Sequence, residues 1–362
     1  MHPAFKHSTL AFAIAAGIFA TSASHAEAVS EQRTVAAFKA VELFGPYHVV
    51  IRAQGKQALE LSGERKQLAD VETIVTGNTL IVRPVSRNGF HFSSGRHRPD
   101  VTIHITASTL ASLRATGSGD VELDQVSGDQ FSVSAEGPGD VRASGAAREL
   151  AVTSRGSGNL DLHQFSAVNV NLAMSGPGDV TLSGVGGELT ADVRGSGDLH
   201  ADALRLSKLT ARLRGPGNAT LAGSSRELRA EVFGSGDLEA HGLTVRDATV
   251  RSRGPGEIQL ASVTESLDAD LAGSGGMSAT LAAKRLQLKM SGPGDVHLAG
   301  TVDSAAAQLT GSGSLDGRRL AAGNTDVTAR GPGSAVVNVR NKGADRLRQM
   351  TIDRSGMRFD GE

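Results

Sequence analysis

An acidic or amide residue recurs at one fixed place in this chain, three positions after the first glycine of a repeated glycine triplet. The members of this column are Asp120, Asp140, Asn159, Asp179, Asp198, Asn218, Asp237, Glu257 and Asp295. Carboxylates in glycine-rich turns could bind calcium, and a pair of carboxylates could hydrolyse a glycosidic bond. Both chemistries need several groups to converge on one point. The elements that carry the column therefore decide what it can do.

Calcium is a poor match to this column. The ion binds six to eight oxygen atoms, whereas the repeat supplies one carboxylate per turn, and Asn159, Asn218, Ser314 and Ser334 replace Asp along it. We expect instead a surface ladder of carboxylates about 5 Å apart, with Asx-type bonding in the turns and basic neighbours just across them. Those basic residues precede the triplets: Arg155, Arg194, Arg214, Arg253 and Arg330.

No pattern typical of a catalytic site accompanies the column. The sequence has no Gly-x-Ser-x-Gly nucleophile motif and no Trp to stack on a sugar. Its histidines, such as His163, His200 and His297, are scattered and form no metal-ligand pair on a helix. We predict a chain that is not an enzyme, with no catalytic residue, no metal ligand and no cofactor. A carbohydrate-active enzyme on a β-helix and a calcium-stabilised secreted module are the alternatives.

The glycine triplets set the period of the chain. Gly-Ser-Gly and Gly-Pro-Gly alternate strictly at intervals of 19 or 20 residues, twelve times in all. Apolar residues alternate with polar ones on both sides of each triplet, as at Leu189, Ala191 and Val193 before Gly195. This period of two predicts two strands per repeat, and stacked repeats pair in parallel with right-handed connections. The sequence predicts an all-β fold, a right-handed parallel β-helix (β-solenoid) of about 19–20 residues per rung.

The triplet itself predicts a type II turn. Pro or Ser suits its second position, and the glycine at the third position would adopt positive φ, so that Gly178→Val should break the turn. The structural turn glycines are Gly117, Gly119, Gly137, Gly139, Gly156, Gly158, Gly176, Gly178, Gly195 and Gly197. The Ser/Pro alternation is compatible with duplication of a two-rung unit, or with serine restoring the N–H that proline lacks.

The pattern divides the chain into four parts. Residues 1–26 resemble a signal peptide, residues 27–113 an N-terminal cap with leading coils, residues 114–338 the regular repeats, and residues 339–362 a polar cap and tail. Two leading segments imitate the triplet context, Leu43 to Val49 and Thr76 to Val82, with Gly77 two rungs before Gly117. We expect the β-helix to start near residue 41.

A basic loop near residues 86–98 offers a candidate surface contact. It is rich in Gly and Ser, and a solvated insertion between strands would have the same composition. The contact residues that we expect, for an anion or a glycan, are Arg87, Arg96, His97 and Arg98.

The first residues predict export. An apolar run from Leu10 to Ala20 ends before Ser24-His25-Ala26, a small-residue cleavage site, and the run is too short to span a membrane. We expect no transmembrane segment after cleavage and a periplasmic or extracellular location. The chain has no Cys and a net charge of −1, which excludes disulfides and argues against a nucleic-acid partner.

The repeated Gly-Ser-Gly-Asp-Leu and Gly-Pro-Gly-Asp-Val units, behind a leading segment such as residues 38–84, resemble a bacterial family, the putative auto-transporter adhesin, head GIN domain. The resemblance covers roughly residues 38–338. It implies an exported or envelope-associated β-helical protein with no established catalytic residues. We therefore expect an adhesin-like or envelope scaffold protein whose partner is an unknown glycan, envelope component or protein. About 25 residues follow the last repeat, too few for a translocator barrel, so self-transport is not expected.

Overall fold

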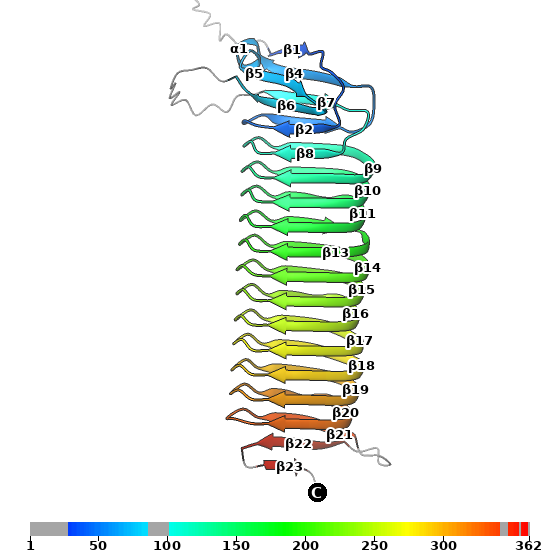
Figure 1. The fold of residues 1–362 in the computed structure, drawn as a ribbon, viewed down its shortest axis with the longest axis vertical. Coiled ribbons are helices and arrows are strands. Elements are labelled where there is room, and N and C mark those ends of the chain that lie inside the picture. The colour runs from blue at the N-terminus through cyan, green and yellow to red at the C-terminus, as the bar shows by residue number, and fades with distance from the viewer. Residues whose placement is uncertain (1–27, 86–100, 341–346, 355, 361–362) are drawn as a thin grey trace, which may run out of the picture.

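The computed structural model describes residues 28–85, 101–340, 347–354 and 356–360. The predicted fold is confirmed, because the chain is almost all β-structure and forms a right-handed β-solenoid of about 11 turns. Figure 1 shows the coils stacked along one axis as a rod, in the order of the sequence.

Most coils of the main stack are single strands of 14 or 15 residues that bend midway. They are β9 (Val121–Ala135), β10 (Val141–Ser154), β11 (Leu160–Met174), β12 (Val180–Ser183), β13 (Val185–Val193), β14 (Leu199–Leu213), β15 (Ala219–Val232), β16 (Leu238–Ser252), β17 (Ile258–Leu271), β18 (Met277–Met290), β19 (Val296–Leu309), β20 (Leu315–Ala329) and β21 (Ala335–Arg340). The coil of β12 and β13 is interrupted at Gly184, which has φ +71°.

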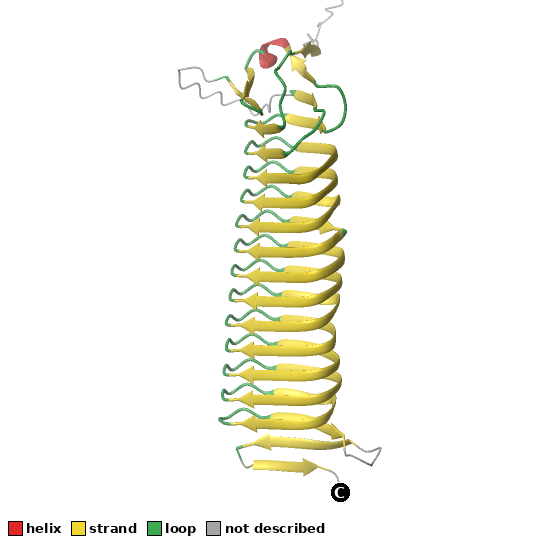
Figure 2. Cartoon of the chain, turned by 45° about the vertical axis from the view of Figure 1, so that its right-hand side comes forward, coloured by secondary structure: helices red, strands yellow, loops and turns green. Residues whose placement is uncertain are grey.

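Equivalent positions of successive coils pair in parallel register. Val141 pairs with Leu160 before the bend, and Val152 pairs with Leu172 after it. The residues before the bend thus form one parallel sheet, here called face A, and those after the bend form a second, face B. The glycine triplets close each coil, and their loops line up along one edge of the rod in Figure 2.

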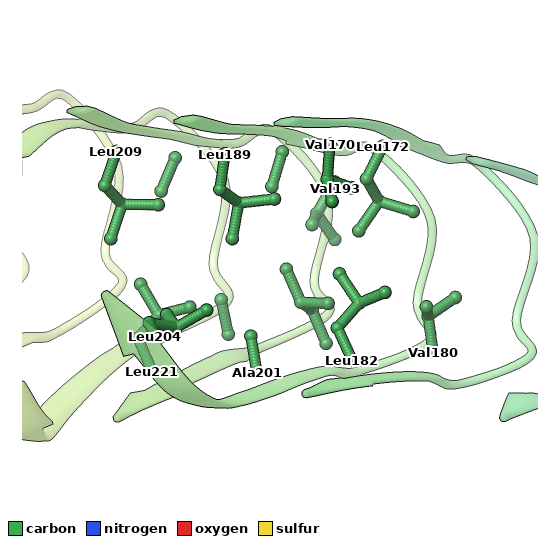
Figure 3. Close-up of a cluster of buried hydrophobic side chains, with 14 of the residues drawn as sticks. Val170, Leu172, Val180, Leu182, Leu189, Val193, Ala201, Leu204, Leu209 and Leu221 are labelled. Carbon is green, nitrogen blue, oxygen red and sulfur yellow. The ribbon is translucent and has the colours of Figure 1, made fainter. Parts of the chain in front are cut away.

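The core is a narrow aliphatic layer between the two faces. Figure 3 shows Val180 and Leu182 of face A pointing toward the row of face B that holds Leu189 and Leu209. All four side chains are at most 1% exposed. Burying one such side chain contributes roughly 1.5–3 kcal/mol, and every coil repeats the term. The stack is therefore stabilised by contacts between neighbouring coils.

The triplet glycines are required for close approach and not for positive φ, which corrects the predicted turn type. Among the triplets only Gly331 has φ in the left-handed range. A Cβ built on Gly178 would lie 2.1 Å from the carbonyl oxygen of Gly158, and one built on Gly176 would lie 2.1 Å from that of Gly156. The turns stack backbone on backbone, so no side chain fits between them.

This stacking uses the amide of the third glycine. Gly178 N–H donates to the Gly156 carbonyl at 3.3 Å, and the same bond recurs along the stack. Among the middle residues, all of which are described, only Ser118 donates its N–H to a neighbouring coil, to Gly45. Serine therefore does not restore a donor that proline removes.

Positive φ occurs instead at the bend between the two faces. The residues there are Gln125, Gly145, Gly184, Ala203, Gly223 and Gly300. The coils that begin with Gly-Pro-Gly are 19 residues long, and those that begin with Gly-Ser-Gly are 20 residues long except the one at Gly273. The register shifts at the bend, for example between Ala143 and Gly145, so the extra residue is absorbed there. Coils thus alternate in length as well as in sequence.

The N-terminal end combines parallel strands that continue the stack with antiparallel strands that lie beyond them. Its elements are β1 (Ala28–Gln32), β2 (Ala40–Leu43), β3 (His48–Arg52), β4 (Ala58–Glu64), α1 (Arg65–Leu68), β5 (Val71–Thr76), β6 (Thr79–Pro84), β7 (Thr102–Thr106) and β8 (Ser112–Ala115). Strands β2 and β3 pair in parallel with β8 and β9, so the turn at Gly45 stacks on the turn at Gly117, as the start near residue 41 predicts.

The prediction for Gly77 is wrong. Strands β5 and β6 pair antiparallel, with Thr76 opposite Thr79, so Gly77 and Asn78 form a two-residue hairpin turn. Gly77 has φ +61°, the conformation that such turns require. The hairpin turn at Gly77 therefore replaces the expected turn between coils, although β6 itself pairs in parallel with β2, and β7 pairs in parallel with β3.

At the other end, two antiparallel strands follow the last parallel one. Strand β22 (Leu347–Asp353) pairs with β21, and β23 (Gly356–Asp360) pairs with β22. The change from parallel to antiparallel pairing ends the succession of coils (Figure 1).

Candidate binding surface

The acidic column is a hydrogen-bonded ladder along the edge of face A. Along most of the column, one carboxylate or amide oxygen accepts a hydrogen bond from the backbone N–H of the equivalent residue in the next coil. Asp140 Oδ1 accepts from Asn159 at 2.7 Å, Asn159 Oδ1 accepts from Asp179 at 3.1 Å, and Asp179 Oδ1 accepts from Asp198 at 2.8 Å. The series continues through Asn218 to Glu257. An Asn serves as well as an Asp, because only an acceptor is needed.

The expected bonding within single turns is therefore corrected to bonding between coils. The backbone hydrogen bonds between coils use the carbonyl of a column residue but not its N–H. The Asp179 carbonyl, for example, accepts from Leu160 N–H, whereas Asp179 N–H needs another acceptor. The preceding side chain supplies it. One oxygen of each such carboxylate is already engaged in holding two coils together.

The expected basic neighbours pair elsewhere. The arginines before the triplets contact other carboxylates: Arg155 lies 3.4 Å from Glu136, which precedes the previous triplet, whereas Arg194 lies 2.6 Å from Asp192 and Arg253 lies 3.0 Å from Asp270, both on face B. These side chains extend from the end of one coil toward face B, and not across the turn. The prediction that they neutralise the acidic column is wrong.

Face B carries a second column in which the charge alternates from coil to coil. Three positions before successive triplets lie Asp192, Arg212, Glu231, Arg251, Asp270 and Lys289, which pair in register. Arg212 Nε lies 3.2 Å from Glu231 Oε2. A slip by one coil would bring like charges together, which is destabilising. This column therefore favours the observed register.

Five carboxyl groups of the described chain have lowered pKa values, those of Glu136, Asp161, Glu231, Asp295 and Asp316. A hydrogen bond from Arg229 lowers the pKa of Glu231, helped by Arg212. Hydrogen bonds from the hydroxyl and N–H of Ser314 lower the pKa of Asp295. For Asp161, burial acts to raise the pKa, but hydrogen bonds from His163 and Arg142 lower it overall. The neighbours that lower the pKa values of Glu231, Asp295 and Asp161 lie either two residues away in the same strand, as Arg229 and His163 do, or at the equivalent position of an adjacent coil, as Ser314 does.

Two shallow grooves lie on the faces near the N-terminal end. The groove on face A has a volume of about 420 Å³ and is lined by charged residues that include Asp140, Arg142, Asp161 and His200. The groove on face B has a volume of about 500 Å³, and amide, hydroxyl and carboxylate side chains line much of it, including Gln130, Glu149, Asn169, Asn171 and Thr190. Both grooves are open strips across several coils.

The other predicted residues are placed as follows. Arg87, Arg96, His97 and Arg98 lie outside the described residues. His163 Nδ1 lies 2.5 Å from Asp161, and His297 lies 4.0 Å from Asp316. Across the described ranges, no three His, Asp or Glu side chains gather to hold a metal ion.

One known protein family matches this chain over its coils. The family described as putative auto-transporter adhesin, head GIN domain, matches residues 37–222, 208–278 and 265–346. The chain belongs to this family. The head GIN domain thus spans both the leading coil and the regular stack, and the resemblance seen in the repeated units is confirmed. No curated protein matches the chain.

Solved structures similar to this GIN-domain chain include proteins from Parabacteroides and Bacteroides. One from Parabacteroides distasonis, described as a putative lipid binding protein, is 17% identical, covers 88% of this chain and 98% of its own, and has a TM-score of 0.38. A putative adhesin from Bacteroides fragilis is 15% identical, with 84% and 97% covered and a TM-score of 0.30. A putative adhesin from Parabacteroides merdae is 16% identical, with 76% and 97% covered and a TM-score of 0.36.

One further observation concerns membranes. Within the described ranges, no helix of this GIN-domain chain is long and apolar enough to cross a bilayer.

Proposed function

We propose that this chain is an exported, noncatalytic β-solenoid that acts as an adhesin-like or envelope scaffold protein. It would bind a glycan, an envelope component or another protein through its two long faces. One observation carries the proposal: the polar side chains stand in columns that run from coil to coil, and the Asp column is occupied in joining coils. Catalysis needs unlike groups that converge on one point, whereas a line of similar groups suits extended contact.

Three further features of the proposal come from the sequence. Cleavage after Ala26 would release a chain that begins at Glu27, in the periplasm or outside the cell. Residues 27–113 and 339–362 would cap the stack and cover strand edges that could otherwise recruit other chains. The loop with Arg87, Arg96, His97 and Arg98 would add a contact at the N-terminal end.

The test is binding of the cleaved chain to a glycan array and to immobilised cell envelope. Variants that place a bulky cation on one face distinguish the surfaces: Thr181→Arg in the groove of face A, Thr190→Arg in that of face B, and the triple change Arg87→Ala, Arg96→Ala and Arg98→Ala in the loop. We expect one face variant to lose binding while the other retains it. Binding lost only in the loop variant would assign the contact to the loop.

Turnover of a polysaccharide would contradict the noncatalytic assignment. The sharpest control is Asp198→Asn, because Asn159 and Asn218 already take the same place in the ladder. This variant keeps the fold and removes one carboxylate. Hydrolysis by the parent chain that is abolished in Asp198→Asn would establish the enzyme alternative.

A further inference from the structure

A third groove lies where the chain leaves the bend and enters face B, half-way along the rod. It has a volume of about 440 Å³ and is lined by three arginines, Arg205, Arg226 and Arg246, together with hydroxyl groups. The hydroxyl residues include Ser224, Thr244 and Thr264. No carboxylate lines it. This composition differs from the grooves of faces A and B, which both contain acidic residues.

Small residues make the hollow. In the column that contains Arg226, the two preceding coils carry Ser207 and Gly187, and Ser207 donates its hydroxyl to the Gly187 carbonyl at 3.1 Å. Gly186 also lines the groove. Because these positions lack long side chains, the arginines border an open space.

Two of the three arginines form a pair of like charges. Arg226 and Arg246 lie side by side in adjacent strands, between the pairs Ser225 to Val245 and Glu227 to Asp247. Like charges in such positions are destabilising, and the column of Asp192 and Arg212 avoids them by alternating in sign. Glu227 and Asp247 pair beside them in the next column, but neither lines the groove, so the charged residues that line the groove are all cations.

Most of this charge is unneutralised by the protein. Arg246 lies 3.4 Å from Asp247, a carboxylate of the next column. Neither Arg205 nor Arg226 forms an ion pair within the described part of the chain. Their donors are therefore free to bind an external anion.

We propose that this groove binds a sulfate or phosphate group carried on a saccharide chain. A guanidinium presents a fork of N–H donors that matches such an oxyanion, and Ser and Thr hydroxyls can donate to its remaining oxygens. A saccharide fits better than a membrane surface, because the cations border a hollow. The exposed large apolar residues of the described chain, which a bilayer would favour, lie outside it: Val85, Val168, Phe233, Met357 and Phe359. The inference stands on this groove and not on the proposed role of faces A and B.

The experiment measures binding of the full cleaved chain to a sulfated heparin tetrasaccharide and to its desulfated counterpart by calorimetry. We expect binding of the sulfated probe, competition by inorganic sulfate, and no binding of the desulfated one. The triple variant Arg205→Gln, Arg226→Gln and Arg246→Gln should bind about tenfold more weakly or worse. The control is Arg148→Gln, Arg285→Gln and Arg319→Gln, which removes the same charge elsewhere on the rod. It should change the affinity by less than about twofold.

Three results would overturn the proposal. Equal weakening in both triple variants would mean nonspecific attraction, and failure of the parent to bind the sulfated probe would mean that the groove takes no such anion. Binding to vesicles of phosphatidylcholine and phosphatidylglycerol through the same three arginines, without binding of the tetrasaccharide, would assign the site to a lipid headgroup instead. Matching melting curves of the parent and both variants show that the fold is intact.

Discussion

The carboxylate of Asp198 accepts a hydrogen bond from the backbone N–H of Asn218, one coil further along the rod, at 2.8 Å. The bond joins side chain to main chain between coils, and the same bond recurs with Asp or Asn as the acceptor. The acidic column, the most suggestive chemical feature of the sequence, is thus part of the coil-to-coil bonding.

Asp198→Ala should destabilise the rod, and Asp198→Asn should not. The alanine variant leaves the N–H of Asn218 without its acceptor, which costs about 1 kcal/mol. The asparagine variant supplies an amide oxygen at the same place. Thermal melting of both variants checks the prediction. Equal stability of the alanine and asparagine variants would show that the side-chain acceptor is dispensable.

Gly178→Ala should destabilise its coil severely, because its Cβ would lie 2.1 Å from the Gly158 carbonyl oxygen. A clash with backbone of a neighbouring coil costs roughly 2 kcal/mol or more. Gly128→Ala is the matched control, since a Cβ there meets nothing closer than 3.9 Å. The measurement is melting together with hydrogen exchange of the flanking coils. A Gly178→Ala variant as stable as Gly128→Ala would contradict the stacked-turn arrangement.

Acid should weaken the rod in part through Asp295. The pKa of this carboxyl is lowered in the folded chain from its ordinary 3.8 by the hydrogen bonds from Ser314. A lowered folded pKa contributes stability above the ordinary value, and this contribution is lost as the pH falls through the folded one. Asp295→Asn cannot titrate, so its melting temperature should fall less than that of the parent between about pH 7 and about pH 3. Parallel pH profiles would exclude a contribution from Asp295.

Removal of calcium should leave the melting temperature unchanged. One oxygen of most ladder side chains is engaged by a backbone amide, and one carboxylate per coil leaves most of a six-to-eight oxygen shell to water. The measurement compares melting with calcium and with a chelator at fixed ionic strength. A substantial drop with chelator would support the calcium-stabilised alternative.

The fold follows from the sequence because its signal is repeated in every coil. Alternation such as Leu189, Ala191 and Val193 fixes which side faces the core, and the triplets fix where the chain turns. The sequence does not determine the type of turn at the triplets, for a physical reason. Glycine is favoured both by positive φ and by close backbone contact, and composition does not separate the two. The bend at Gln125 and Ala203 carries positive φ without glycine and therefore leaves no signal.

Some of the surface features can be predicted from the sequence. The alternating charges of Asp192, Arg212 and Glu231 are visible in the sequence once the coils are aligned on their triplets. The like-charged pair of Arg226 and Arg246 is visible in the same alignment. Gly77 with Asn78 is a sequence typical of a two-residue hairpin turn. The spacing of 40 residues between Gly77 and Gly117 favoured a coil turn there instead. The groove beside Gly186 depends on how five coils stack, which a linear pattern does not give.

The alternating column on face B favours deletions and insertions of two coils at a time over those of one coil. Deletion of residues 215–233, one coil, would bring Arg212 beside Arg251, whereas deletion of residues 215–253, two coils, would bring Arg212 beside Asp270. Only the second keeps opposite charges adjacent and a Gly-Ser-Gly coil followed by a Gly-Pro-Gly coil. Gain or loss of paired coils would move the two ends of the protein apart or together by about 10 Å at a time, with both faces preserved. The distance between the two ends would thus change in fixed increments.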